Sequence, residues 1–422
     1  MSEDDKGKIK VKKSWIEKLF SPIIPGSVKS SVLSLCSITL GSGVLSLPLA
    51  VYTCGLALGM DLLIIGGLIC SFYYKILIKA SDMTKQYTHA GIAEALFGFY
   101  FKRGLEIGII LHCFGVVCAY QAIMSSFLCS VLHSFGVLAQ PDDDQLRVTA
   151  IILINIFVIF PLSLFKEFSA LRYASSISVI SCIYITLVIL FQTPAYLATN
   201  PGFMNNIKLF DFNIYVVDAM SITLFAYESS RAIPIIYQEL NKRNYNRMSK
   251  VIDRGNGLMI VLYTVIGVFG FFSYMNKMPN LVVFRQTLDG TPNAYDWPMV
   301  YARLGVAMTI MMSIPMNINP TRLALTQIIS GTNYKEDLAR HVGLTAMLLF
   351  GSVLVAIAIP DAIFYFKILG GIFSVIMGVI YPCLIQMYLP ESFTTKIVTV
   401  VLTVIVSLIG FSSVVITINS IS

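Results

Sequence analysis

Residues 225–234 place an acid, two hydroxyls and a base inside an otherwise apolar stretch, with the sequence FAYESSRAIP. On insertion scales, a carboxylate at the centre of a bilayer costs about 2.5–3.5 kcal/mol, so an embedded one is expected to serve a function. Glu228 is therefore a candidate for proton coupling or gating. The alternative is an ion pair with Arg231, three residues later on the same helix face, that only fixes the local structure.

A second segment, residues 37–48, reads SITLGSGVLSLP and also suits a continuous helix poorly. Gly41 and Gly43 tolerate non-helical dihedral angles, and Pro48 removes a backbone donor. Irregular backbone at membrane depth is tolerated only where protein buries it or water lines it. Close helix packing through small residues is the alternative for this segment. We call residues 37–48 the first break and residues 225–234 the second break.

The two breaks correspond in their spacing. Pro234 comes five residues after Ser229, as Pro48 comes five residues after Gly43. Paired interruptions at corresponding places in two halves of a chain are the best sequence pointer to an inverted-repeat transporter site. Backbone N–H groups of residues 41–43 suit a carboxylate, and backbone carbonyls of residues 225–227 suit an ammonium group. The two breaks therefore predict a site that holds a zwitterion largely through the backbone.

The elements that must carry these segments are membrane helices. Hydrophobic residues make up 56% of the 422 residues, charged residues only 13%, and the mean hydropathy is +0.77. A soluble domain has about a quarter charged residues, and about 20 apolar residues cross a bilayer as a helix. We predict an all-α polytopic membrane protein with about eleven spans. The predicted spans are 30–50, 55–78, 105–133, 147–165, 171–192, 212–238, 256–275, 298–318, 341–360, 363–388 and 394–418.

Charge asymmetry predicts the orientation of these spans. Of the 30 lysines and arginines, 23 fall in segments on the side of the N-terminus, six fall on the other side, and Arg231 lies inside a span. Positive residues favour the cytoplasmic side, so the N-terminus is expected there and the C-terminus is expected outside or in a lumen. The chain divides into a basic tail (1–29), a transmembrane domain (30–418) and a short C-terminal tail (419–422). The basic tail is interpreted as topogenic, and no other feature suggests nucleic-acid binding.

Cysteine and histidine residues give no sign of a metal site, a disulfide framework or a cofactor. All eight cysteines lie in or at the edge of apolar runs, and no CxxC occurs, so they are expected to be small core residues. His112 and His133 are expected to find partners within the bundle. No phosphate-binding loop or nucleophile elbow is present, which argues against an enzyme.

Three motifs together resemble the amino acid/auxin permease family, part of the amino acid–polyamine–organocation superfamily. They are GSGVLSLP at 41–48, FAYESSRAIPIIYQEL at 225–240 and SIPMNINPTR at 313–322. The resemblance implies a five-plus-five inverted repeat with broken helices 1 and 6, one extra C-terminal helix, and amino acid transport by alternating access. FAYE followed by Pro234 is similar to the FAFE pattern of the proton-coupled and vacuolar branches. Ser229, Ser230 and Arg231 depart from it, because small or apolar residues are usual there.

The candidate site residues fall into three groups. Substrate-binding candidates are Gly41, Ser42, Gly43, Phe225, Ala226, Tyr227, Ser229 and Tyr120. Coupling or gating candidates are Glu228 and Arg231. By resemblance to sodium-coupled relatives, an ion site would involve Ser37, Leu40, Thr309 and Ser313. For Tyr120, Thr309 and Ser313 the alternative is helix packing, a role that serine and threonine commonly have between membrane helices.

We predict a secondary active or facilitative amino acid transporter that favours neutral or aromatic substrates. H+ is favoured over Na+ as the coupling ion, because Glu228 is the carboxylate embedded in a predicted site segment. The alternatives are an amino acid sensor, a sodium-coupled symporter and a structural subunit of a larger membrane assembly. The expected partners are an amino acid and the lipid bilayer, without a cofactor or nucleic acid. Both the plasma membrane and a vacuolar or lysosomal membrane fit this reading.

Overall fold

The structure is a computed structural model that describes residues 26–136, 144–164, 172–199, 207–274, 278–285, 287–288, 296–330 and 338–420. The predicted basic tail lies outside the described residues as far as residue 25, and so do the last two residues of the C-terminal tail.

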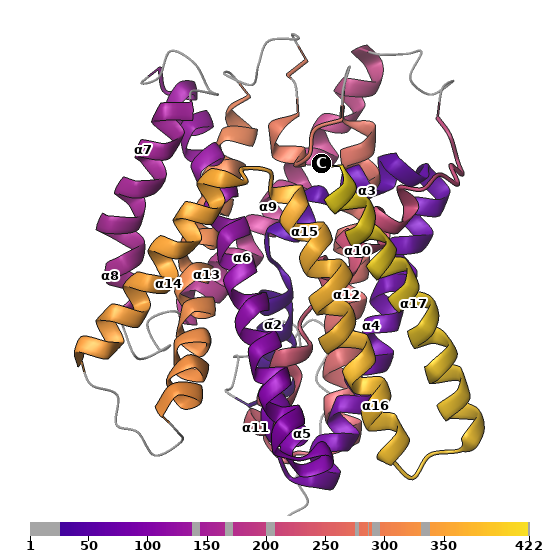
Figure 1. The fold of residues 1–422 in the computed structure, drawn as a ribbon. Helices are drawn as coiled ribbons and strands as arrows, with labels where there is room; N and C mark the ends of the chain where they lie inside the picture. Colours follow the sequence, from indigo (N-terminus) through magenta and orange to yellow (C-terminus); the bar gives the residue numbers. More distant parts are fainter. Residues whose placement is uncertain are drawn as a thin grey trace, which may run out of the picture.

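Nearly every described residue is helical, and the described part of the chain contains no strand. The helices run side by side as one bundle, with α5 (His89–Phe97) at the end opposite the C-terminus (Figure 1). Large apolar side chains such as Leu68, Phe191 and Leu354 are exposed on its flanks, as expected for contact with lipid. The longest helices are α4 (Leu56–Thr84), α6 (Phe99–Ser134), α9 (Arg172–Thr199), α12 (Tyr245–Phe272), α13 (Trp297–Ser330), α14 (Leu338–Ala358) and α17 (Phe393–Asn419).

Two further spans contain π-helical turns. One consists of α7 (Asp144–Ile154), η2 (Asn155–Ile159) and α8 (Phe160–Ser163). The other consists of α15 (Ala362–Ile368), η6 (Leu369–Ser374), η7 (Ile376–Ile380) and α16 (Tyr381–Tyr388). In both, a proline follows directly, Pro161 in α8 and Pro382 in α16. A proline lacks an N–H and crowds the preceding turn, which explains the wider hydrogen-bond register just before it.

Nine helices in the described residues are long and apolar enough to cross a bilayer, and α2 with the following η1 and α3 adds a bent tenth. These ten overlap ten of the predicted spans. The remaining predicted span, 212–238, corresponds to α10 and α11, each of which is shorter than the 18 residues that such a crossing requires. The fold class is as predicted, while the count of eleven stays a prediction.

Both breaks interrupt their helices as predicted. At the first break, α2 (Val28–Thr39) gives way to η1 (Ser42–Ser46) and α3 (Leu47–Cys54), with a bend of 57°. At the second, α10 (Val216–Tyr227) gives way to η4 (Ser230–Ala232) and α11 (Ile233–Glu239). Pro48 and Pro234 each lie in the first turn of the new helix, where the missing N–H has no partner to lose.

Candidate functional site

The first break starts where α2 ends. Gly41 is extended (φ −113°, ψ −165°), and its N–H donates to the Thr39 carbonyl at 2.9 Å. Ser42 is 2% exposed, and its hydroxyl has no hydrogen-bond partner in the described residues. The first N–H groups of a helical turn have no partner within that turn. The predicted carboxylate cradle therefore narrows to the N–H groups of Ser42 and Gly43, together with the Ser42 hydroxyl.

The second break is held open by side chains from two other helices. The Tyr74 hydroxyl in α4 donates to the Tyr227 carbonyl (2.6 Å) and accepts from the Ser229 N–H (2.9 Å). In α5, His89 Nε2 lies 2.9 Å from the Ser230 carbonyl and must donate there, since a carbonyl only accepts. These bonds satisfy backbone groups that the interruption removes from the helical ladder.

The two breaks pack against each other and against α6. A Cβ on Gly43 would lie 3.0 Å from the Phe225 ring and 3.1 Å from Ala226 Cα, so this close approach requires glycine. A Cβ on Gly41 would lie 2.9 Å from the Tyr120 hydroxyl. The structure thus brings five of the predicted substrate-binding residues to one place, between the breaks and α6.

Tyr263 of α12 also joins the two breaks, and the sequence reasoning missed it. Its hydroxyl lies 2.9 Å from the Thr39 carbonyl and 3.0 Å from the Ala226 carbonyl. No motif surrounds this tyrosine, so only the fold reveals its position. Tyr263 and Tyr74 occupy carbonyls that were predicted to receive a substrate ammonium group. Each carbonyl oxygen keeps a second lone pair for such a bond.

The side chains of Tyr227 and Ser229 contact the helices behind the second break. The Tyr227 ring packs on Tyr263, with centroids 4.8 Å apart, and lies close to Gly67 of α4. The Ser229 hydroxyl donates to the Tyr74 hydroxyl at 3.1 Å. Both side chains therefore support the break from the side of α4 and α12.

The proposed ion pair between Glu228 and Arg231 is not formed, so that alternative is wrong for this conformation. Within the described residues, no nitrogen of Arg231 lies within ion-pair distance of Glu228. Glu228 Oε1 instead accepts from the N–H and the hydroxyl of Ser230, at 3.0 and 2.5 Å. Arg231 reaches α6 and donates to Cys113 Sγ. α10 ends at Tyr227 and Glu228 is already extended, so the regular i,i+3 geometry that the pair needs is absent.

The predicted ion-site residues separate in the structure. A cavity of about 20 Å³, large enough for one water molecule, is lined by Leu40 and Thr309 but not by Ser37 or Ser313. Its wall also includes Gly41 and Ser42 of the first break, and Ser178, Ser181 and Cys182 of α9. The contribution of α9 was missed, because isolated serines in a membrane helix resemble packing residues. The hydroxyls of Thr309 and Ser313 donate to carbonyls four residues earlier, as packing residues do.

His112 does not find the partners that were expected for it. The side chain is 1% exposed, and neither ring nitrogen has a hydrogen-bond partner in the described residues. The ring stacks on Phe373 of η6, with centroids 5.9 Å apart. The charge of Arg231 lies close enough to act on both His112 and Glu228. The region around the second break therefore holds an imidazole, a guanidinium and a carboxylate that form no ion pair with one another.

Residues 25–422 match the family model described as transmembrane amino acid transporter protein. The putative amino acid transporter AAT1 of Toxoplasma gondii is 26% identical over 307 residues, which are 73% of this chain and 41% of that relative. The sodium-coupled neutral amino acid symporter 2 of Danio rerio is 24% identical over 415 residues, which are 92% of this chain and 81% of that relative. The chain thus spans less than half the length of the Toxoplasma relative.

Two solved structures share the fold at 13% sequence identity. One is a substrate-bound, outward-open Na+-coupled sialic acid symporter, with a TM-score of 0.52 over 93% of this chain and 90% of the other. The other is MhsT in complex with L-phenylalanine, with a TM-score of 0.58 over 91% of this chain and 98% of the other. At this identity the likeness concerns the fold alone, and it confirms the predicted fold class.

Proposed function

Since this chain belongs to the transmembrane amino acid transporter protein family, we propose that it carries amino acids across a membrane by alternating access, with the two breaks as its substrate site. The direct packing of Gly43 against Phe225 and Ala226 carries this proposal, because it joins both interrupted helices at one point. Discontinuous helices that meet in this way offer backbone groups of opposite polarity to a zwitterion.

The substrate carboxylate would bind at the N–H groups of Ser42 and Gly43. The unpartnered hydroxyl of Ser42 gives it a further donor. The ammonium group would use the free lone pairs of the carbonyls of residues 225–227. Phe225, which stacks on Phe366 with centroids 4.7 Å apart, gives the side-chain region an apolar wall. Because Arg231 is engaged with Cys113, we propose neutral substrates, aromatic ones included.

For coupling we propose a proton carried by Glu228. This carboxylate is half-buried in the second break and forms no ion pair among the described residues, so a proton can bind it without first breaking an ion pair. Sodium is the second candidate. The cavity lined by Leu40, Ser181 and Thr309 favours it, as does the similarity to a symporter whose name states sodium coupling.

The test is counterflow and gradient-driven uptake of labelled neutral amino acids in proteoliposomes. Counterflow separates a transporter from a sensor or a structural subunit, because only a transporter exchanges substrate. With pH and sodium gradients imposed separately, Glu228→Gln should keep exchange at equal pH and lose accumulation driven by a pH gradient. Uptake driven by sodium alone, retained by Glu228→Gln and lost by Thr309→Ala, would replace the proton proposal with the sodium one.

For orientation we propose a cytoplasmic N-terminus and an extracellular or lumenal C-terminus, in the plasma membrane or a vacuolar or lysosomal membrane. A tag at Ser2 should be accessible from the cytoplasm and a tag at Ser422 from the opposite side. Two tags on the same side would contradict the odd number of spans.

A further inference from the structure

The connection between α12 and α13 folds over the end of the bundle that the charge pattern assigns to the outside. Its short helical turn η5 (Val282–Phe284) contacts η1 of the first break. The side chain of Val282 lies beside Gly270 at the position where Pro48 of α3 also packs. This connection therefore covers the outer side of the first break, and contacts that hold the connection in place also keep the break covered.

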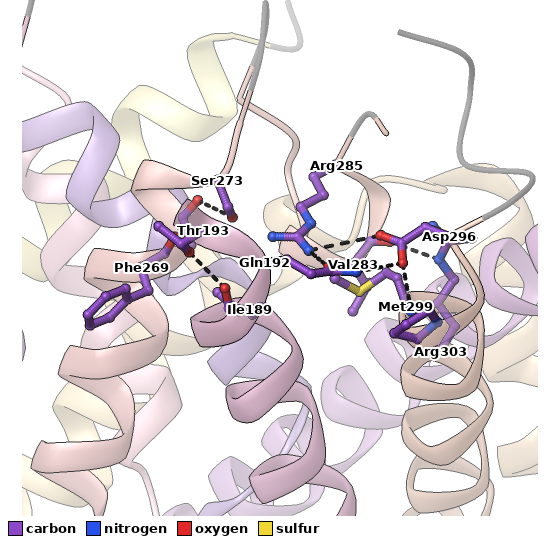
Figure 2. Close-up of polar contacts among 12 residues, drawn as sticks. Ile189, Gln192, Thr193, Phe269, Ser273, Val283, Arg285, Asp296, Met299 and Arg303 are labelled. Carbon is purple, nitrogen blue, oxygen red and sulfur yellow. Dashed lines mark hydrogen bonds and ion pairs between the residues drawn. The ribbon is translucent and has the colours of Figure 1, made fainter. Parts of the chain in front are cut away.

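Arg285 follows η5 and is buried, with 1% of its surface exposed. Its guanidinium lies over the Tyr196 ring of α9, 4.6 Å from the centroid, and its Nη2 donates to the Gln192 side-chain carbonyl. Figure 2 shows this side chain reaching towards Asp296, whose Oδ2 lies 3.9 Å from Nη2. The Nε and Nη1 groups have no hydrogen-bond partner in the described residues.

A second arginine, Arg303 of α13, is buried next to this group and is 0% exposed (Figure 2). Its Nε donates to the Val283 carbonyl at 2.8 Å, and its Nη1 donates to the Ser130 hydroxyl of α6 at 2.8 Å. Its Nη2 has no partner among the described residues. The two arginines lie close enough for the charge of Arg285 to act on Arg303.

Arg285, Arg303 and Asp296 form a charged cluster, and its charges do not balance within the described part of the chain. Among the described residues, Asp296 is the one carboxylate within ion-pair distance of either arginine, and its contact is with Arg285. It already accepts from the Gln192 amide (2.9 Å) and the Met299 N–H (3.3 Å). Two buried cations thus face one anion, and three guanidinium nitrogens have no hydrogen-bond partner among the described residues. Buried charges are normally paired, and an unpaired donor carries the full cost of its lost hydration.

We propose that Arg285 and Arg303 form a binding site for a compact monovalent anion, either a halide or a small carboxylate. One negative charge would neutralise the excess positive charge and accept from the unused N–H groups. Arginine suits this role, because it stays charged when buried and offers several donors in one plane. A bound anion would tie η5 to α9 and α13, and so would hold the connection over the first break.

The test measures thermal unfolding of the purified full-length protein at constant ionic strength. Sodium gluconate, whose anion is much larger than chloride or formate, is replaced stepwise by sodium chloride or by sodium formate. The unfolding midpoint should rise to a plateau in at least one series. A response to chloride alone identifies a halide site, and a response to formate identifies a carboxylate site.

Variants then assign the response to the cluster. Arg285→Gln and Arg303→Gln should each reduce the rise in the unfolding midpoint. Asp296→Asn should lower the anion concentration that gives half of this rise, by on the order of tenfold, because a competing negative charge is removed. Arg322→Gln is the matched control, since Arg322 is a buried arginine (2% exposed) of α13 bonded to Ser163 and Thr345 instead. It should lower the midpoint but keep the anion response.

Two results would overturn the proposal. One is an unfolding midpoint that neither anion raises relative to gluconate. The other is a response that Arg285→Gln and Asp296→Asn leave unchanged. If the arginine variants fail to fold, Asp296→Asn alone still decides, since a merely structural ion pair predicts lower stability and no gain in anion affinity. The assay involves no transport, so its outcome is independent of the proposed function.

Discussion

The first break and the second break interrupt membrane helices by different means. In the first, most bonds come from its own segment, since Gly41 donates to Thr39 and Ser46 donates to Gly43, while Tyr263 of α12 adds a bond to the Thr39 carbonyl. In the second, the bonds come from Tyr74 and His89, which lie 141 or more residues away along the chain. A break held mainly by its own segment can change shape with little loss of tertiary bonds, here the bond from Tyr263 to the Thr39 carbonyl. A break bonded to α4 and α5 must move together with them or release those bonds.

The largest expected effect comes from closing the contact between the breaks. Gly43→Val should abolish amino acid uptake in proteoliposomes, because its Cβ alone would press against Phe225 and Ala226, and overpacking costs about 1–3 kcal/mol. Gly257→Val is the matched control, because no atom lies within 4 Å of the position of its Cβ. Normal uptake by Gly43→Val would show that the breaks need not touch during the cycle.

Tyr74→Phe tests the tertiary support of the second break. Loss of this hydroxyl leaves the Tyr227 carbonyl and the Ser229 N–H without their partner, at about 1–3 kcal/mol for each buried group. We expect a lower free energy of unfolding together with reduced uptake. Tyr73→Phe is the control on the same helix, since its hydroxyl bonds to Thr403 of α17. Equal losses of uptake in both variants would mean that the second break has no special dependence on Tyr74.

Acid should weaken the second break and spare the first, which contains no titratable side chain. Burial, with a smaller effect from the charge of Arg231, lowers the pKa of His89 from 6.5 to about 4. The unfolded chain therefore takes up a proton below pH 6.5 while the folded one does not, and stability falls as the pH decreases. Between pH 7 and 5.5 this amounts to about 1 kcal/mol. His89→Gln should remove this component of the pH dependence of unfolding, and His133→Gln should keep it.

The smallest expected effect on stability belongs to Ser42. Its hydroxyl has no partner in the described residues, so Ser42→Ala should change the free energy of unfolding by less than about 0.5 kcal/mol. Ser230→Ala, which removes a bond to Glu228, should cost about 1–2 kcal/mol. For substrate affinity we expect the reverse order, with a larger loss in Ser42→Ala than in Ser230→Ala. A KM for uptake that Ser42→Ala leaves unchanged would remove this hydroxyl from the carboxylate site.

Much of this architecture was predictable, because each helix that crosses a bilayer needs a long run of apolar residues, which is visible in the sequence. Apolar runs predicted all ten candidate spans of the described residues. Glycines or polar residues followed by a proline predicted both breaks. The residues that support the breaks were not predictable. Tyr74, Tyr263 and His89 carry no motif, and their roles depend on which helices become neighbours. The alternative of an ion pair between Glu228 and Arg231 was wrong for a related reason. Spacing of i,i+3 predicts contact only along a continuous helix, and the helix is interrupted here.

The hydroxyl of Tyr263 carries a single hydrogen, yet two carbonyls lie within reach of it at nearly equal distances. Thr39 ends α2 and Ala226 lies near the end of α10, so the two halves of the repeat share one donor. If the halves shift relative to each other, the hydrogen can pass from one carbonyl to the other without leaving the oxygen that carries it. The number of hydrogen bonds then stays constant through the movement. Such a shared donor favours neither end position, which suits a protein that must visit both.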